Sequence, residues 1–152
     1  MKIGIDPQSG ALVKCETVSR VGVKTRTGDL EAVCRSSDGR LFVTDDRGRS
    51  AYEITAEGKV VRELEALKAE FSSAGYNLGA EAMEFSSFGS ENCLWTMTEL
   101  PRTNDVNRLK LFRYSLRDDR ISASYDYGHD YAFVDFLNDP IDGSLLVLER
   151  DI

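Results

Sequence analysis

Acidic residues recur at both ends of paired apolar runs in this sequence, and carboxylates spaced in this way could bind a cation or transfer protons. Three apolar runs carry an acid near their start and three return runs end in one: Glu31, Glu81 and Asp135 for the first set, then Asp45, Glu99 and Glu149. Carboxylates that face each other across a sheet repel by up to about 1 kcal/mol per pair, so a cation is expected beside them. Calcium, which takes carboxylate oxygens, and arginine are the two candidates.

These residues divide into three candidate roles. The candidates for general acid–base catalysis are Glu31, Glu81 and the only histidine, His129. The candidate calcium ligands are Asp45, Glu99, Asp135 and Glu149. The candidate substrate-binding cations, which follow the second acids closely, are Arg47, Arg102 and Arg150. An arginine-paired or solvated network without a ligand also explains the acids, and His129 also fits an ordinary loop position.

Composition and charge exclude several classes of protein. The 152 residues carry 19 basic and 26 acidic side chains, and the net charge of −7 argues against a nucleic-acid partner. No apolar run approaches the roughly 18 residues that span a bilayer, so no membrane partner is expected. The N-terminal stretch MKIGIDPQSG lacks the apolar segment of a signal peptide, which leaves the compartment open. Three cysteines fit neither a disulfide framework nor a zinc motif, so buried thiols are expected.

An internal repeat sets the expected fold. The runs that carry Glu31, Glu81 and Asp135 recur at intervals of 50 and 54 residues, which is about the size of a four-stranded propeller blade. The sequence therefore predicts an all-β chain that forms a portion of a β-propeller, with about three four-stranded blades, of which two are complete and the terminal ones are halves.

Each unit is expected to form short antiparallel strands. The strands of the first blade are predicted at 31–35, 41–45, 50–55 and 59–64, and those of the second at 81–85, 93–98, 109–115 and 121–125. Half units remain at the two ends: a hairpin of 3–6 with 11–15, and one within 135–149. A short helix is expected at 65–72, where good helix formers carry an apolar stripe; a long helix there would favour an αβ domain instead.

The parts add up to a single partial propeller domain over 1–152. Its predicted sections are an outer hairpin at 1–28, blades at 29–66 and 79–127, and an inner hairpin at 132–152. Symmetry about each turn predicts the cross-strand acid pairs: Glu31 with Asp45, Glu81 with Glu99, and Asp135 with Glu149. Inner strands converge on the central channel of a propeller, so acids of different blades should meet there. Matching positions of the return strands are expected in the core: Phe42, Trp95 and Leu146.

The motifs resemble one known family. DLEA at 29–32 precedes SDGRLFVTD at 37–45, EAM at 81–83 precedes a strand that ends in Thr98-Glu99, and GSLLVLERD closes the chain at 143–151. This pattern resembles the phytase-like propellers described by the phrase esterase-like activity of phytase, and propellers of the SdiA-regulated group share part of it. The matching residues are Glu31, Asp45, Glu81, Glu99, Asp135, Glu149 and Arg150.

The resemblance implies a function and a location. A member of this family is expected to be a periplasmic or secreted hydrolase of phosphoester or ester substrates, with acidic channel residues that bind calcium. The alternative is a noncatalytic propeller that binds a small molecule, a cation or a protein. Such propellers have about six blades, so the chain is either part of a longer protein or half of a homodimer that completes the ring.

Overall fold

Short antiparallel strands make up most of the chain, as the repeat predicts. The computed structural model describes residues 2–16, 20–72, 79–88, 91–99, 108–128, 132–139 and 142–151. Its elements in these ranges are β1 (Lys2–Ile5), β2 (Leu12–Glu16), β3 (Leu30–Arg35), β4 (Leu41–Asp45), β5 (Ser50–Ile54), β6 (Val60–Glu63), α1 (Glu65–Phe71), β7 (Ala80–Phe88), β8 (Glu91–Thr98), β9 (Arg108–Ser115), β10 (Arg120–Gly128), β11 (Ala132–Asn138) and β12 (Leu145–Arg150). No helix in these ranges is long and apolar enough to cross a membrane.

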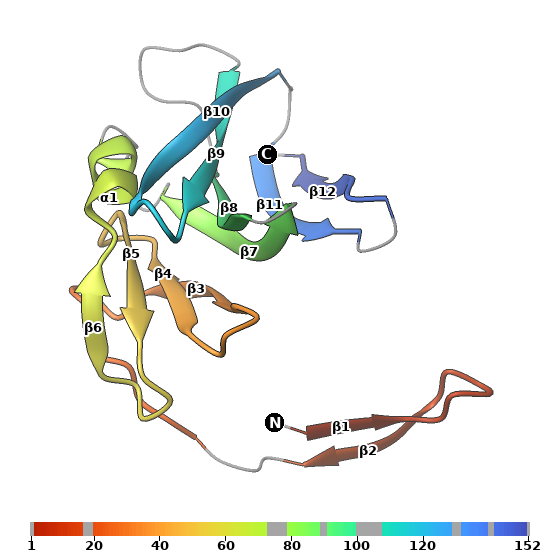
Figure 1. The fold of residues 1–152 in the computed structure, drawn as a ribbon. Helices are drawn as coiled ribbons and strands as arrows, with labels where there is room; N and C mark the ends of the chain where they lie inside the picture. Colours follow the sequence, from red (N-terminus) through yellow and green to blue (C-terminus); the bar gives the residue numbers. More distant parts are fainter. Residues whose placement is uncertain are drawn as a thin grey trace.

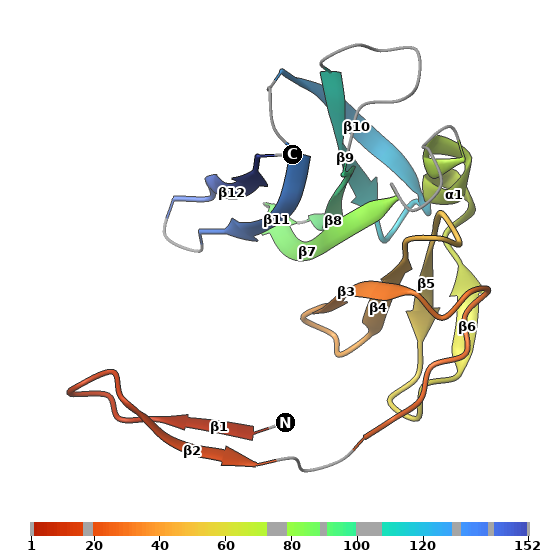
Figure 2. The same cartoon turned by 180° about the vertical axis from the view of Figure 1, so that it is seen from behind.

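Two of the sheets are complete four-stranded meanders. The first has the order β3-β4-β5-β6 and the second the order β10-β9-β8-β7, with every neighbouring pair antiparallel. Figures 1 and 2 show these sheets as successive blades, with α1 at the junction between them. The β3–β4 turn closes through Gly39 at φ 91°, a conformation that glycine adopts without strain. The chain is therefore a portion of a β-propeller.

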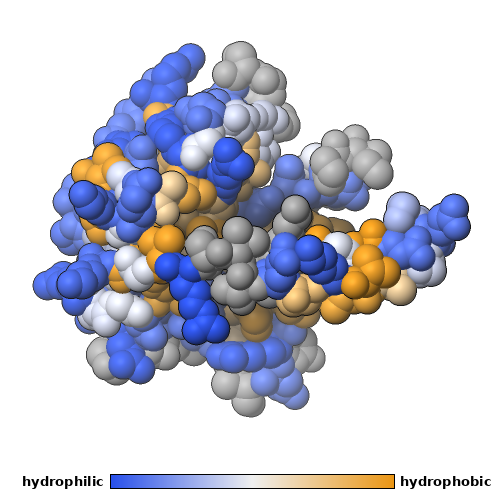
Figure 3. All heavy atoms as spheres, turned by 90° about the horizontal axis from the view of Figure 1, so that it is seen from below, coloured by the Kyte–Doolittle hydropathy of each residue, from blue (hydrophilic) through white to orange (hydrophobic). Residues whose placement is uncertain are grey.

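The chain ends in two-stranded hairpins, β1–β2 and β11–β12. The β1–β2 hairpin projects away from the blades in both ribbon views. Figure 3 shows apolar side chains along this arm, where Ile3, Ile5, Leu12 and Val13 are exposed.

Cys15 lies on the same hairpin and is exposed, so the expectation of three buried thiols is wrong for it, whereas Cys34 and Cys93 are buried.

The main core lies between the two complete blades and under α1. Leu67 and Phe71, four residues apart on one helix face, are both fully buried, and the Phe71 ring meets Phe112 of β9 edge-on at 6.2 Å. The helix has no side-chain hydrogen bond at its N-cap, Leu64, so apolar packing holds it in place. The short helix predicted at 65–72 is confirmed.

The core predictions for the return strands fail at the third hairpin. Phe42 of β4 is fully buried and Trp95 of β8 is half-buried, but Leu146 of β12 is 58% exposed. Leu146 follows the same sequence pattern as its counterparts, yet β12 has no outer strand beside it in the described sheet. Burial at this position depends on the neighbouring strand and not on the side chain alone.

A β-bulge near the start of each inner strand changes the predicted acid pairing. The bulges fall between Leu30 and Val33, between Ala80 and Ala82, and between Phe133 and Asp135. As a result Asp45 pairs with Leu30 and not with Glu31, and Glu149 pairs with Phe133 and not with Asp135. The predicted register of the acid pairs is therefore off by one or two residues, in part because an extra residue in one strand shifts the register beyond it, although the side chains of Glu81 and Glu99 still meet.

Candidate functional site

The bulges make Asp46, and not Asp45, the structural counterpart of Glu99. The Asp46 N–H donates a hydrogen bond to the Asp29 carbonyl at 2.9 Å, and the Glu99 N–H donates to the Gly79 carbonyl at the same distance. Both acids therefore stand just beyond the second strand of their blade, opposite the residue that precedes the inner strand. Both are also buried.

These two acids join each blade to the next. The Gly79 N–H, at the start of the second blade, donates to the Asp46 side chain, and the Phe133 N–H of β11 donates to the Glu99 carbonyl at 3.0 Å. A Cβ at position 79 would lie 2.7 Å from the Asp46 carbonyl oxygen, so only glycine allows this approach. The junctions place carboxylates from successive blades close together.

Five carboxylates form what we call the acid cluster: Asp29, Glu31, Asp46, Glu81 and Glu99. Burial and the neighbouring acids raise the pKa of Glu31 and of Asp46, even though the Gly79 hydrogen bond opposes the rise for Asp46. One oxygen of Asp46, Oδ2, is buried and has no hydrogen-bond partner among the described residues. An unpaired buried carboxylate oxygen is costly, which favours a proton or a cation at this cluster.

Within the acid cluster, the pKa of Glu81 is raised the most. Its pKa is raised to about 7, first by burial and then by the charges of Glu99, Glu31 and Asp46, with a side-chain hydrogen bond to Glu99 adding to the rise. A carboxyl with this pKa exchanges its proton near neutral pH, as a general acid or base must. The predicted catalytic candidate Glu81 thus has the acidity that the role requires.

Two arginines partly neutralise the cluster. Arg150 of β12 forms an ion pair with Glu99, and Arg47 Nε lies 3.1 Å from Asp29 Oδ2. Two of the three cations that the sequence placed near the acids therefore contact them. Within the described ranges, two positive charges against five carboxylates leave the cluster with an excess of negative charge when all five are ionised.

A groove of about 650 Å³ opens beside the cluster. Its walls come from β3, β7, β11 and β12, and it brings together three acids that the sequence singled out, Glu31, Glu81 and Asp135. Glu84 of β7 lines it as well, and burial followed by the charge of Asp135 raises the pKa of Glu84. The expectation that acids of successive inner strands meet holds for these residues.

The four predicted calcium ligands do not lie together. Asp45 is fully buried and its carboxylate accepts hydrogen bonds from Thr25, Thr27 and Gly48, while Glu149 accepts one from the Tyr127 hydroxyl at 3.0 Å. Across the described ranges no three Asp, Glu, His or Cys side chains are close enough to hold a metal ion. These residues by themselves do not fit a closed calcium site.

Sequence reasoning missed Asp29, Asp46 and Glu84. Asp46 could have been considered, because it directly follows the predicted residue Asp45 in the sequence. A one-residue bulge in the opposite strand is enough to bring Asp46 into the position predicted for Asp45. Glu84 carried none, because its role depends on β11 packing beside β7. The candidates His129 and Arg102 lie outside the described residues.

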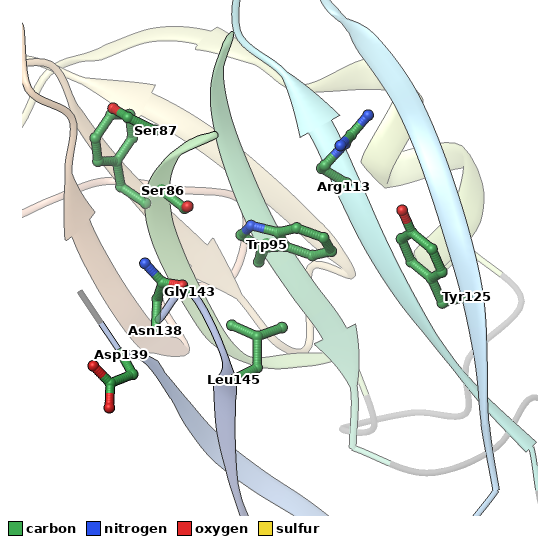
Figure 4. A pocket seen from close by; sticks show the side chains of 10 residues that line it. Ser86, Ser87, Trp95, Arg113, Tyr125, Asn138, Asp139, Gly143 and Leu145 are labelled. Atoms are coloured by element: carbon green, nitrogen blue, oxygen red, sulfur yellow. The ribbon is translucent and has the colours of Figure 1, made fainter. Parts of the chain in front are cut away.

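A second cavity of about 530 Å³ lies between the second blade and the β11–β12 hairpin. In Figure 4 Trp95 lies at the centre, with Tyr125 on one side and Asn138 on the other. The Trp95 and Tyr125 rings are 6.0 Å apart and tilted by 31°. This aromatic cavity was not predicted, since Trp95 was assigned to the core.

The comparisons with known proteins place the chain in a family. A family model described as phytase-like, esterase-like activity of phytase, matches residues 6–152. The chain belongs to this phytase-like family. The predicted resemblance is therefore confirmed over nearly the whole sequence.

No curated protein matches the chain. Among solved structures, the one titled structure of Dos1 propeller is similar over 70% of this chain, with 12% sequence identity and a TM-score of 0.36. The matched part covers 39% of that structure's chain. The phytase-like chain thus spans well under two thirds of the propeller it matches.

Proposed function

We propose that this phytase-like propeller contributes the acid–base site of an ester or phosphoester hydrolase, in the groove beside the acid cluster. The observation that carries the proposal is Glu81, a groove-lining carboxyl whose pKa is about 7. Burial and neighbouring acids produce the shift, and a proton-transferring group needs a pKa of this kind.

Two groove carboxyls supply complementary roles. Glu81 in its protonated form donates a proton to the leaving oxygen of the ester, while Glu31 as a carboxylate takes a proton from the attacking water. The water oxygen forms the new bond to carbon or phosphorus as the bond to the leaving oxygen breaks. Glu31 is then protonated and Glu81 ionised, and proton exchange through solvent restores both.

The charge of the groove bears on the choice of substrate. Excess negative charge repels a free phosphate dianion, so a neutral ester is the preferred substrate unless a cation neutralises the acids. Calcium is the cation that the family resemblance suggests, and a periplasmic or secreted location is proposed on the same ground. No step of the proton transfer depends on calcium.

The test is hydrolysis of a chromogenic carboxylic ester and a chromogenic phosphomonoester across pH 5 to 9, with and without calcium. We expect Glu81→Gln to lower kcat by about 100-fold or more, since a positioned acid or base typically contributes that much. The control is Glu57→Gln in the exposed β5–β6 turn, which should leave kcat unchanged. Equal rates for both variants would refute the acid–base role.

A noncatalytic binding propeller is the second candidate. It is favoured by the ion pairs of Arg150 with Glu99 and Arg47 with Asp29, which partly neutralise the cluster without a ligand, and by the aromatic cavity at Trp95 and Tyr125. This function predicts ligand binding that quenches Trp95 fluorescence, with no turnover of either ester.

A further inference from the structure

A hollow of about 350 Å³ in the first blade is lined mainly by basic residues. Its walls are formed by Arg26, Arg47, Gly48, Arg49, Lys68 and Ser72. Four of these six residues are positively charged and none is acidic, in a protein whose net charge is −7. We call this feature the basic hollow.

Asp45 holds the two main walls of the basic hollow together. Its carboxylate accepts hydrogen bonds from Thr25 Oγ1 at 2.5 Å, from Thr27 N–H at 2.9 Å and from the Thr27 hydroxyl, on either side of Arg26. It also accepts one from the Gly48 N–H at 3.0 Å, between Arg47 and Arg49. One buried carboxylate thus fixes two segments that carry three arginines.

The close approach of the second wall depends on Gly48. A Cβ at this position would lie 2.7 Å from the Asp45 Cγ atom, closer than real Cβ atoms approach other atoms. The turn between β4 and β5 therefore has to be glycine at this point to reach Asp45. The arrangement is a built structure and not a chance gathering of surface side chains.

Arg49 occupies a backbone conformation that glycine would hold more easily. Its φ is 50°, in the left-handed region that a residue with a Cβ atom rarely adopts. Its guanidinium Nη1 donates a hydrogen bond to the Ser72 carbonyl at 3.1 Å, just beyond α1. This contact holds the Arg49 side chain against the opposite wall of the basic hollow.

The acids that pair with the basic hollow lie outside its lining. Asp29 contacts Arg47, and Glu63 and Glu65 contact Lys68. Asp29, Glu63, Glu65 and Asp45 offset much of the charge of these cations. No acidic side chain lines the cavity itself, so an oxyanion there would meet basic and neutral residues only. Guanidinium groups also present paired donors that match the oxygens of a phosphate.

We propose that the basic hollow binds an oxyanion of the phosphate class, either free phosphate or the phosphoryl group of an ester. The site meets the acid cluster at Arg47, which lines the basic hollow and pairs with Asp29, but none of the five acids lines the hollow. Its occupancy does not depend on the hydrolase function proposed above. It would hold a phosphoryl group at the first blade, away from the repulsion of the groove carboxylates.

Titration calorimetry with inorganic phosphate and with phenyl phosphate tests the site, at constant ionic strength set with sodium chloride. We expect saturable binding of both ligands, because each presents a terminal phosphoryl group. Arg26→Gln and Arg49→Gly should each weaken binding at least fivefold. Arg49→Gly is informative because glycine relieves the backbone strain, so this variant keeps its fold while the guanidinium is lost.

The matched control is Arg117→Gln, an exposed arginine of the second blade, which should bind phosphate as the unchanged protein does. Failure of both ligands to bind would overturn the proposal, as would equal binding by the Arg26 and Arg49 variants. Binding of phenyl phosphate alone would support a site for phosphoesters. The Glu81→Gln variant should retain phosphate binding, which separates this proposal from the hydrolase function.

Discussion

The Gly79 N–H at the start of the second blade donates a hydrogen bond to the side chain of Asp46, the residue that follows β4 of the first blade. Asp46 is buried, and Gly79 approaches its backbone so closely that no side chain fits between them. The same contact forms one edge of the acid cluster. The junction that orients the blades is therefore also a wall of the candidate site.

A side chain at position 79 should weaken that junction. A Cβ there would meet the Asp46 carbonyl oxygen at 2.7 Å, so the backbone must shift, and we expect Gly79→Ala to lower the free energy of unfolding by about 1–3 kcal/mol. Urea denaturation measures the change. Gly128→Ala is the control, since nothing lies within 4 Å of a Cβ at position 128, and equal effects of the two variants would contradict the prediction.

The raised pKa of Glu81 predicts how stability changes with pH. The folded protein holds this proton up to about pH 7, whereas the unfolded chain releases it near 4.5, so the contribution of Glu81 to stability falls as pH rises between these values. Above pH 7 we expect Glu81→Gln to raise the free energy of unfolding by about 1–2 kcal/mol, allowing for screening at a partly exposed group.

Denaturation of this variant and of Glu57→Gln at pH 5 and pH 8 is the measurement. The two variants should differ at pH 8 and agree at pH 5. The same difference at both pH values would mean that proton uptake by Glu81 is not its cause.

The lowered pKa of Asp45 predicts the opposite dependence of stability on pH. Burial opposes ionisation, but hydrogen bonds from Thr25, Thr27 and Gly48 outweigh it and lower the pKa of Asp45. Its contribution to stability is present above the unfolded pKa and is lost as pH falls through the lower, folded value. We expect Asp45→Asn to cost about 1–3 kcal/mol at pH 7 and to weaken phosphate binding, because both walls of the basic hollow loosen.

Asp38→Asn is a suitable comparison for Asp45→Asn, because Asp38 lies in an exposed turn of the same blade. Chemical denaturation and phosphate titration of both variants test the prediction. Intact phosphate binding in Asp45→Asn would show that the hydrogen bonds of the Asp45 carboxylate to the two walls are not needed for the basic hollow to bind phosphate.

The negative charge of the acid cluster allows a test of calcium binding. Ionised carboxyls attract a cation and protonated ones do not, so millimolar calcium should raise the Tm more at pH 8 than at pH 5.5. The double variant Glu31→Gln with Asp135→Asn removes two acids that line the groove and should lose the rise. A Tm that does not respond to calcium at pH 8 would refute the prediction.

The two terminal hairpins allow a test of the predicted homodimer. The β1–β2 hairpin of one copy could complete the β11–β12 hairpin of another, and two copies would then supply six four-stranded sheets. Light scattering would give twice the chain mass of 17.0 kDa. Ile5→Lys on β1 should shift the particle toward monomer, since Ile5 is exposed on the hairpin that would be covered; a monomeric unchanged protein contradicts the ring.

Much of the local structure followed from the sequence. The Asp38-Gly39 turn, the alternation of short apolar runs and the 50-residue interval from Glu31 to Glu81 predicted the strands and the blade repeat. Leu67 and Phe71 marked the helix. These features depend on residues close in the chain, whose turn preferences and hydrophobic spacing act locally.

The candidate site was predicted only in part. The sequence identified Glu31, Glu81 and Glu99, and it predicted acid pairs within each hairpin as well as contacts between acids of different blades. Glu81 does meet Glu99 of its own hairpin, but it also lies near Glu31 and Asp46 of the first blade, and Asp46 replaces Asp45 because a bulge cannot be located from residue types alone.

The sequence by itself determined the repeat, the strands and the abundance of acids at strand ends. Only the tertiary structure decided which acids meet. The side chain of Asp45 became a clamp for three arginines, while its neighbour Asp46 joined the acid cluster. The physical reason is that a charged group's pKa, partners and role depend on burial and on charges brought near by packing, and residues distant in the chain supply both.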